Sequence, residues 1–267
     1  MAGLVDAKAF TSGEKASITH PIVDLRAARG GNRDRQLICG DAVVVIDRQE
    51  GWSFVQSQKD GYCGWITSDS HGPAEEMTHW ITARLSHLYP EPRVQAEATA
   101  VLPFGSLLRV VEVVGAFART SLGYVPLPHV SAVQHRPTDP VAVAQSFLGA
   151  PYLWGGNTAL GIDCSGLVQT AFLACQLACP GDSDQQAQMA EPLAPSAPLL
   201  PGDLIFWKGH VAMVCGPDLL IHANGHSMDV CTETITGCID RIAKAGGGPV
   251  TARLRHPGAQ GVIRSAG

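Results

Sequence analysis

The sequence predicts an α+β domain that follows two small all-β barrels. Short strand-like segments broken by turns fill residues 20–67, and the same order of segments returns about sixty residues later. After residue 135 the spacing of apolar residues changes from two to about four, which is typical of helices. The 18 prolines and 29 glycines of the 267-residue chain also favour several short-stranded units over one helical bundle.

The first barrel is predicted over residues 20–70, behind an N-terminal extension of residues 1–19. Its strands are AVVVI, WSFVQS and GYCGWI, which are rich in β-branched and aromatic residues. The turn segments DRQEG and QKDG separate these strands, as expected for a unit built from short hairpins.

A second barrel is predicted over residues 77–134 because the chain repeats itself there. The segment CGDAVVVIDRQEGWSFVQS matches FGSLLRVVEVVGAFARTS, and DGYCGWI matches LGYVPLP. Gly40 then corresponds to Gly105, and Tyr62 corresponds to Tyr124. Such a repeat indicates two copies of one small β-unit in tandem, with HGPAEE as the joint between them.

The α+β domain is predicted over residues 138–260. Asp139 and Pro140 form an N-cap followed by a first-turn proline, and a short helix over VAVAQSFLG comes next. Apolar residues at helical spacing predict a second helix over residues 164–179. DLIFWK, HVAMVC and LLIHAN are predicted strands, TITGCIDRIAKAGGG a helix, and VTARLRH a last strand.

The charge and hydropathy of the chain exclude two kinds of partner. A net charge of −5 with 16% charged residues leaves no basic stripe for a phosphate backbone, so we expect no nucleic acid. The first thirty residues contain no apolar block of signal-peptide length, and no run elsewhere is long enough to span a bilayer. We therefore expect no membrane association and a cytoplasmic location.

The eight cysteines are predicted to be reduced thiols. Most of them lie in apolar segments such as QLICGDAVVV and TAFLACQLAC, where a thiol behaves as a small hydrophobic group. Cys175 and Cys179 share a helical face, but no closely spaced cysteine or histidine partners accompany them. We therefore expect no metal site and no cofactor.

Cys164 differs from the other cysteines because it opens the predicted helix over residues 164–179. The unpaired N–H groups and the macrodipole at a helix N-terminus favour negative charge, so the pKa of this thiol is expected to be lowered. A thiolate is a strong nucleophile. Cys175 and Cys179 lie further along the helix, on the face expected to pack, and are predicted to be inert.

A nucleophilic cysteine needs a base, and the base needs a group that orients its ring. His210 begins the strand HVAMVC, and His222 lies in the next strand, LLIHAN. If the hairpin turns about Gly216, the two imidazoles face each other; a turn centred on Pro217 and Asp218 offsets them. The sequence leaves this register open.

Three segments in this order, YLWGGNTALGIDCSGLV, PGDLIFWKGHVAMV and LLIHANG, resemble the NlpC-type cell-wall peptidases. The resemblance covers nearly all of residues 138–256 and implies a papain-like fold that hydrolyses peptides of bacterial murein. It further implies that Cys164 is the nucleophile, that His210 is the general base and acid, and that His222 orients His210.

The two barrels resemble the tandem bacterial Src-homology-3-like domains of one subgroup, the γ-D-glutamyl-L-diamino acid endopeptidases or dipeptidyl-peptidases VI. This resemblance implies cleavage between D-glutamate and the diamino acid of small murein peptides with a free N-terminal L-alanine, in murein recycling. The first barrel of this subgroup holds the substrate's amino terminus with a tyrosine and a carboxylate. The residues implied to contact substrate are Tyr152, Asp163, Ser165, Ser183, Tyr62 and either Asp34 or Asp41.

Several of these residues also have a purely structural interpretation. Ser183 fits the N-cap of a helix over SDQQ, with Gln186 completing a capping box. Asp163 fits the N-cap of the helix that Cys164 opens. Tyr62 fits a barrel core position, because Tyr124 occupies the same place in the repeat. Alternative functions are another wall amidase or endopeptidase with the same thiol chemistry, or an inactive module that binds wall peptides.

Overall fold

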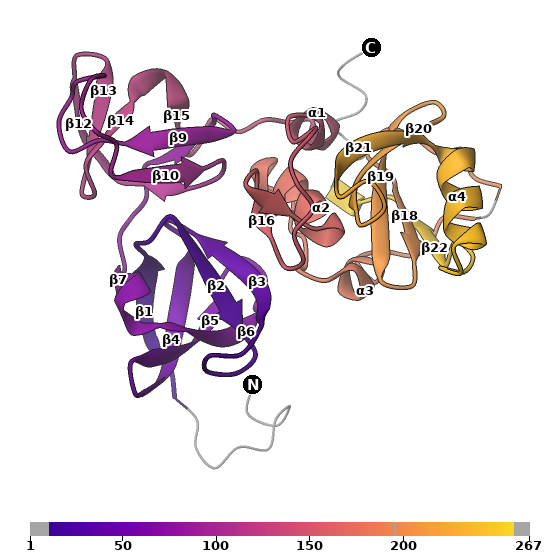
Figure 1. The fold of residues 1–267 in the computed structure, drawn as a ribbon, viewed down its shortest axis with the longest axis horizontal. Helices are drawn as coiled ribbons and strands as arrows, with labels where there is room; N and C mark the ends of the chain where they lie inside the picture. The colour runs from indigo at the N-terminus through magenta and orange to yellow at the C-terminus, as the bar shows by residue number, and fades with distance from the viewer. Residues whose placement is uncertain (1–10, 195, 259–267) are drawn as a thin grey trace.

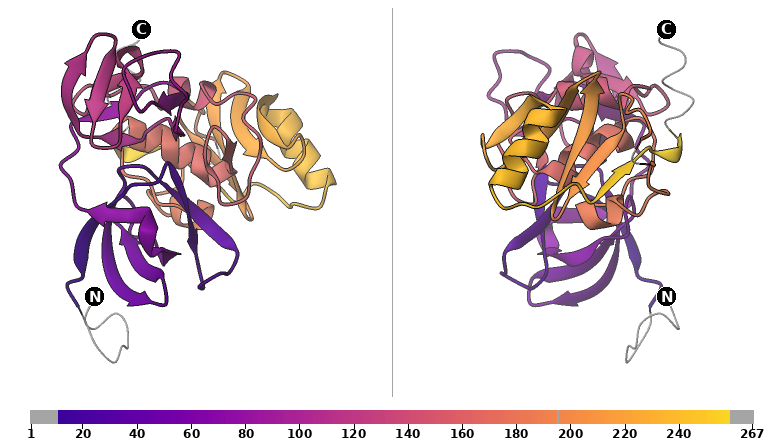
Figure 2. Two further views of the ribbon diagram at one scale, coloured as in Figure 1. Left: turned by 60° about the vertical axis from the view of Figure 1, so that its left-hand side comes forward. Right: turned by 90° about the vertical axis from the view of Figure 1, so that its right-hand side faces the viewer.

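The computed structural model describes residues 11–194 and 196–258, which form two small β-units and one α+β domain (Figure 1). Residues 1–10 of the predicted extension, and residues 259–260 of the predicted third domain, lie outside the described residues. In the views of Figures 1 and 2, both barrels lie on the same side of the third domain, away from α4 (Ile235–Lys244). No helix in the described ranges is long and apolar enough to cross a membrane.

The first barrel is a sheet of seven antiparallel strands in the order β3-β2-β6-β5-β4-β1-β7. Alternate residues of its strands face one core, which includes Leu25, Val55 and Ile66. The strands are β1 (Glu14–Ile18), β2 (Ile22–Arg26), β3 (Arg33–Ile38), β4 (Ala42–Gln49), β5 (Trp52–Ser57), β6 (Cys63–Thr67) and β7 (His71–Pro73).

The predicted limits of the first barrel, residues 20 and 70, are wrong at both ends. β1 pairs with β4 and with β7, and Ala16 and Ile18 of β1 are buried in the barrel core. The segment EKASI contains only two apolar residues and therefore carries no strand signal. The first barrel thus includes residues 14–19, which were predicted to belong to the extension.

The second barrel consists of three small sheets packed around Ile81, Leu102 and Val125. Its Gly105 has a φ of 88°, and Gly40, which the repeat aligns with it, has a φ of 84°. The strands are β8 (His79–Ile81), β9 (Leu85–Leu88), β10 (Ala100–Pro103), β11 (Leu107–Leu108), β12 (Val110–Val114), β13 (Phe117–Thr120), β14 (Tyr124–Pro126) and β15 (Val130–Ala132).

The third domain is built on an antiparallel sheet of five strands in the order β21-β20-β19-β18-β22. The strands are β18 (Leu204–Trp207), β19 (His210–Gly216), β20 (Leu219–Asn224), β21 (Asp229–Thr234) and β22 (Ala252–Leu254). Before them come α1 (Pro140–Gln145), β16 (Asn157–Thr158), β17 (Gly161–Ile162), α2 (Cys164–Ala174) and α3 (Ser183–Gln186).

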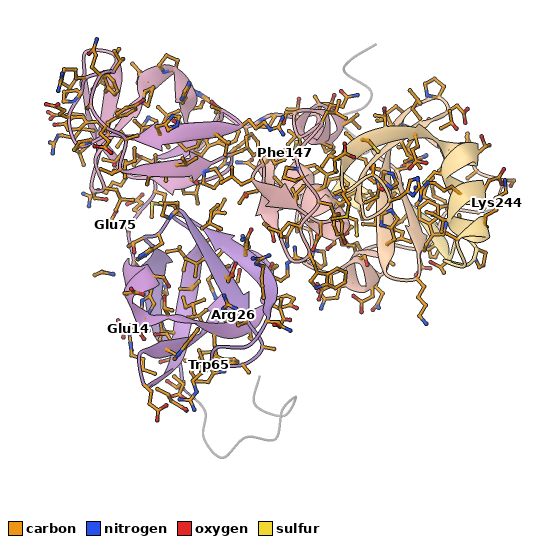
Figure 3. The ribbon with its side chains drawn as sticks, viewed as in Figure 1. Glu14, Arg26, Trp65, Glu75, Phe147 and Lys244 are labelled. Atoms are coloured by element: carbon orange, nitrogen blue, oxygen red, sulfur yellow. The ribbon has the colours of Figure 1, made fainter. Side chains whose placement is uncertain are left out.

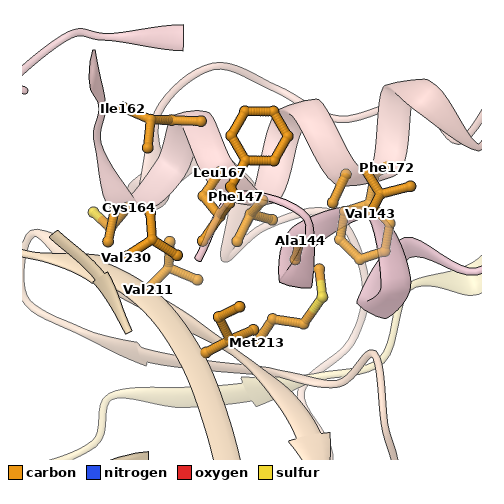
Figure 4. Close-up of a cluster of buried hydrophobic side chains, with 14 of the residues drawn as sticks. Val143, Ala144, Phe147, Ile162, Cys164, Leu167, Phe172, Val211, Met213 and Val230 are labelled. Atoms are coloured by element: carbon orange, nitrogen blue, oxygen red, sulfur yellow. The ribbon is translucent and has the colours of Figure 1, made fainter. Parts of the chain in front are cut away.

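Two helices cover opposite faces of this sheet. Leu167 and Phe172 of α2 share a core with Val211 and Met213 of β19 (Figure 4). On the other face α4 packs through Cys238 against a second cluster. Alternate residues of β19 therefore face different helices, as the pleat of a strand requires.

Helix α2 is shorter than predicted. It ends at Ala174, five residues before the predicted end at 179. Gln176 has a positive φ of 60°, a left-handed conformation that cannot continue a right-handed helix. The prediction extended the helix to residue 179 because Cys179 continues the helical spacing of apolar residues. Cys179 is indeed buried, but it belongs to the following loop.

The first barrel is joined to α2 by a buried arginine. Arg35 of β3 is only 3% exposed. Its guanidinium donates to Ser165 Oγ at 3.2 Å and to Gln169 Oε1 at 3.3 Å, both on α2. It also pairs with Asp182 at 3.4 Å. Because a buried guanidinium needs partners, these bonds fix the barrel against the first turns of the helix.

Two further contacts bring the other parts of the barrels against the third domain. A Cβ on Gly155 would lie 2.5 Å from the carbonyl oxygen of Asp34, so the backbones approach as closely as glycine allows. Phe147, which follows α1, packs edge-on against Phe104 of the second barrel, with 5.6 Å between ring centroids. Figure 3 labels Phe147 near α1.

Candidate active site

Cys164 is the first residue of α2, as the sequence predicts, and Asp163 caps this helix. Asp163 Oδ1 accepts hydrogen bonds from the Gly166 N–H at 2.6 Å and from Ser165 Oγ at 3.1 Å. Its other oxygen accepts from the Gly155 N–H at 2.8 Å. Both oxygens of this buried carboxylate are therefore used within the protein, as its structural interpretation as an N-cap requires.

The Cys164 thiol is buried, with 6% exposure, between α2 and β19 (Figure 4). Burial is the main reason that its pKa is raised to about 12, and the charge of Asp163 raises it further. Hydrogen bonds from the backbone N–H groups of Val211, Ser165 and Cys164 itself act in the opposite direction and lower this pKa. The expectation of a lowered pKa is therefore wrong, because loss of water outweighs the helix N-terminus.

His210 and His222 meet although their hairpin has the offset register. Gly216 pairs with Leu219, so the turn contains Pro217 and Asp218, and the register shifts between Val214 and Gly216. His210 Nε2 nevertheless lies 2.8 Å from His222 Nδ1. Diagonal neighbours across two strands are within reach of long side chains, which explains this contact.

His210 is an uncharged base at neutral pH. Its pKa is lowered to about 3, first by burial and then by the charges of His222 and Arg241, while Glu233 acts to raise it. The thiol lies beside the amide of Val211, the residue after His210. Since Nε2 of His210 is bonded to His222, Nδ1 is the nitrogen left to accept a thiol proton.

Glu233 and Arg241 extend this chain of contacts, and the sequence reasoning missed both. His222 Nε2 lies 3.0 Å from Glu233 Oε1 on β21. Arg241 of α4 donates to both Glu233 oxygens, Nη2 to Oε1 at 2.5 Å and Nε to Oε2 at 3.0 Å. Glu233 lies two residues from Cys231, the cross-strand partner of His222, so strand alternation was the available signal.

Three of the expected substrate residues, Tyr152, Ser165 and Ser183, lie around the start of α2. Tyr152 is half-buried, and its pKa is raised to about 12 by burial and then by the charges of Cys164 and Asp163. Ser165 follows Cys164 and accepts from Arg35. Helix α3, which begins at Ser183, is tied to the first turn of α2 because Gln186 Nε2 donates to the Ser165 carbonyl at 2.9 Å.

Tyr62 of the first barrel faces the same region. Its pKa is raised to about 12, first by burial and then by the charges of Asp182 and Asp34. The Asp34 carboxylate makes no side-chain hydrogen bond and no ion pair with a described residue, but its charge acts on Tyr62. Burial also raises the pKa of Asp182, a residue that the sequence reasoning did not select. A phenol and two carboxylates thus converge where the first barrel meets α2 and α3.

In this region the two carboxylates that the sequence left open differ in their contacts, and the predicted capping role of Ser183 is wrong. Asp41 pairs with Lys59 at 2.6 Å and accepts from the Ile38 N–H, and it lines a 220 Å³ cavity between the three domains. Of the two carboxylates that the sequence left open, Asp34 is the one whose charge acts on Tyr62, together with that of Asp182. Ser183 does not cap α3, because the N-cap residue is Asp182 and no side-chain capping bond is made.

His222, Cys231 and Glu233 bring potential metal ligands within 4.8 Å of one another, but the set does not fit a cation. Asn224 Oδ1 accepts from the N–H groups of His226 and Ser227, which turns its NH2 group toward His222 and Cys231. Arg241 holds Glu233. A donor hydrogen at Cys231 Sγ and the positive charge of Arg241 at Glu233 therefore already occupy two of the three ligand atoms.

A cysteine at the start of a helix that packs on an antiparallel sheet carrying a histidine pair defines a papain-like cysteine peptidase. A model of the NlpC/P60 family matches residues 149–243, and one of the bacterial dipeptidyl-peptidase Sh3 domain matches residues 25–70. The chain belongs to the NlpC/P60 family.

Two named relatives and one solved structure match most of the chain. The chain is 30% identical over 230 residues to the gamma-D-glutamyl-L-lysine dipeptidyl-peptidase of Bacillus subtilis (strain 168), covering 75% of this chain and 76% of that protein. It is 26% identical to dipeptidyl-peptidase 6 of Lysinibacillus sphaericus over 214 residues, 71% and 79% of the two chains. An NlpC/P60 family structure from Bacillus cereus has the same fold, with a TM-score of 0.77, 21% identity and coverage of 91% and 99%.

The lowered pKa of His210 predicts an acid-tolerant enzyme. A general base works in its unprotonated form, so a pKa lowered to about 3 keeps His210 competent as the pH falls through 6.5, the ordinary pKa of histidine. We expect the acid limb of kcat/KM to lie well below pH 6.5 when a peptide substrate is assayed from about pH 4 to about pH 9. An acid limb at or above pH 6.5 would show that His210 is more hydrated, or bears a proton, in the working enzyme.

Proposed function

We propose that this peptidase hydrolyses the γ-D-glutamyl-L-diamino acid bond of small murein peptides that carry a free N-terminal L-alanine. The observation that carries the proposal is the group formed by Tyr62, Asp34 and Asp182, which the first barrel and α3 present close to the first turn of α2. The names of the relatives from Bacillus subtilis and Lysinibacillus sphaericus agree with this substrate class.

In the proposed reaction Cys164 is the nucleophile. His210 Nδ1 takes the thiol proton while Sγ forms a bond to the amide carbonyl carbon, which gives a tetrahedral oxyanion. The Cys164 N–H is free of intrahelical bonding at the start of α2 and donates to that oxyanion. His210 then protonates the leaving amine of the diamino acid, and water hydrolyses the resulting thioester.

The same geometry supports a proposed requirement for a free amino terminus. The Asp34 carboxylate has no hydrogen-bond or ion-pair partner among the described residues, and burial disfavours the charged form of Asp182. A substrate ammonium placed beside Tyr62 would pair with the Asp34 carboxylate, while Asp182 is already paired with Arg35. An acylated amine offers no charge and leaves the Asp34 carboxylate uncompensated, whereas Asp182 keeps its ion pair with Arg35, so binding of the acylated peptide costs free energy.

We also propose a cytoplasmic role in recycling such peptides. All eight cysteines are free thiols, Cys39, Cys179 and Cys238 among them being buried, which suits a reducing compartment. Immunoblotting of fractionated cells should find the protein with cytoplasmic markers; recovery from the culture medium or the envelope would contradict this role.

Product analysis tests the substrate. Wild-type protein incubated with L-Ala-γ-D-Glu-diaminopimelate should release L-Ala-D-Glu, detected by mass spectrometry, and Cys164→Ala should release none. The N-acetylated peptide should be cleaved at least about tenfold more slowly, because it cannot supply the ammonium. Equal rates for the two peptides would retain the nucleophile but refute the amine site. No cleavage of either peptide would favour a binding module.

The two carboxylates that the sequence left open provide a matched pair of variants. Asp34→Asn should lower kcat/KM for the free-amine peptide by about tenfold to a hundredfold and should change cleavage of the N-acetylated peptide little. Asp41→Asn changes a carboxylate of the same barrel that pairs with Lys59, and its kcat/KM should stay near that of the wild type. An equal loss in both variants would assign the effect to barrel stability instead of amine binding.

A further inference from the structure

The hydrogen bonds behind the histidine pair determine where its protons lie. We propose that Glu233, held by Arg241, is a positioning residue that fixes the tautomers of His222 and His210, so that Nδ1 of His210 is left bare for the thiol proton. This inference rests on the proposed function only for the roles of Cys164 and His210. It assigns a part in the reaction to two residues that do not touch the substrate.

The argument begins at α4, which anchors the carboxylate. Arg241 lies on this helix, whose Cys238 and Ile235 are packed against the sheet. Its two hydrogen bonds occupy one lone pair on each oxygen of Glu233. The bonds from Arg241 and His222 lower the pKa of Glu233 despite its partial burial. Glu233 is thus ionised and can only accept hydrogen bonds.

His222 must therefore carry its proton on Nε2. This nitrogen lies 3.0 Å from Glu233 Oε1, and a bare nitrogen facing a carboxylate oxygen would be repelled. Asn224 Nδ2 is also 3.2 Å from Nε2 but has other acceptors for its two hydrogens. These are Ser227 Oγ at 2.9 Å and Cys231 Sγ at 3.3 Å. The charged acceptor takes the Nε2 proton.

The tautomer of His210 follows from that of His222. A neutral imidazole has one ring proton, so Nδ1 of His222 is bare and accepts at 2.8 Å from His210 Nε2, which must be protonated. Nδ1 of His210 is then also bare. The chain of bonds from Arg241 through Glu233 and His222 thereby prepares the lone pair that the reaction needs.

The same chain stabilises the charge that develops during the reaction. When the thiol proton moves to His210 Nδ1, the ring becomes an imidazolium while the sulfur bonds to the carbonyl carbon. Glu233 favours positive charge on both histidines. When the proton passes on to the leaving amine, His210 returns to its starting tautomer, so the positioning system is unchanged by the cycle.

Two substitutions of Glu233 separate its hydrogen bond from its structural contacts. In Glu233→Leu the polar groups remaining near His222 Nε2, Asn224 and Arg241, are donors, so Nε2 should become an acceptor and both histidines should change tautomer. In Glu233→Gln an oxygen can still accept the Nε2 proton. We expect kcat to fall about a hundredfold in Glu233→Leu with KM little changed, and to recover at least about tenfold of this loss in Glu233→Gln.

The direct test is 15N nuclear magnetic resonance of the histidine side chains in full-length protein without substrate. Spectra of His210→Gln and His222→Gln assign the resonances. Wild type and Glu233→Gln should show protonated Nε2 and bare Nδ1 at both rings, and Glu233→Leu should show the reverse. A wild-type His222 protonated on Nδ1, or unchanged tautomers in a folded Glu233→Leu, would overturn the inference. Because no substrate is present, failure of the proposed substrate class would leave this result intact.

Discussion

Burial of Cys164 and His210 keeps both groups uncharged at neutral pH, and the remaining features of the site act around that constraint. Loss of water raises the pKa of the thiol to about 12 and lowers that of the imidazole to about 3. An uncharged pair can react only if the proton acceptor already points its lone pair at the thiol. In our account Glu233 and Arg241 meet this requirement because they fix the ring protons of His222 and His210 on Nε2, which leaves Nδ1 of His210 bare.

A second constraint is the packing of the first barrel against the peptidase domain. Arg35 is a buried cation whose partners lie on α2 and in the loop before α3, so the barrel and the start of α2 form one packed unit. Gly155 allows the backbone of Asp34 to approach. A residue of the barrel can therefore be placed near Cys164 with the accuracy of a folded core, which a flexible linker would not permit.

Local signals in the sequence were enough to place Cys164 at the start of α2, because Asp163 supplies a cap and apolar residues follow at helical spacing. Local signals were not enough to predict the register of the hairpin that carries His210 and His222. The register of the β19–β20 pairing shifts between Val214 and Gly216, and this irregularity brings His210 into contact with His222.

Other features needed the assembled molecule. Arg35 and Ser165 are 130 positions apart, so nothing local marks their contact. Asp34 and Asp41 are equivalent by residue type, and only the ion pair of Asp41 with Lys59 separates them. The pKa of Cys164 was predicted in the wrong direction because the depth of burial of a thiol is a property of the packed domain, whereas a helix start can be recognised locally.

The central claim is that Cys164 attacks the γ-glutamyl carbonyl and carries the alanyl-glutamyl group as a thioester. Rapid acid quenching during turnover of L-Ala-γ-D-Glu-diaminopimelate, followed by peptide mass spectrometry, tests this directly. The account predicts an alanyl-glutamyl acyl adduct on the peptide that contains Cys164, with free diaminopimelate released in the same phase. An adduct on another cysteine, or an adduct that retains the diamino acid, would contradict it.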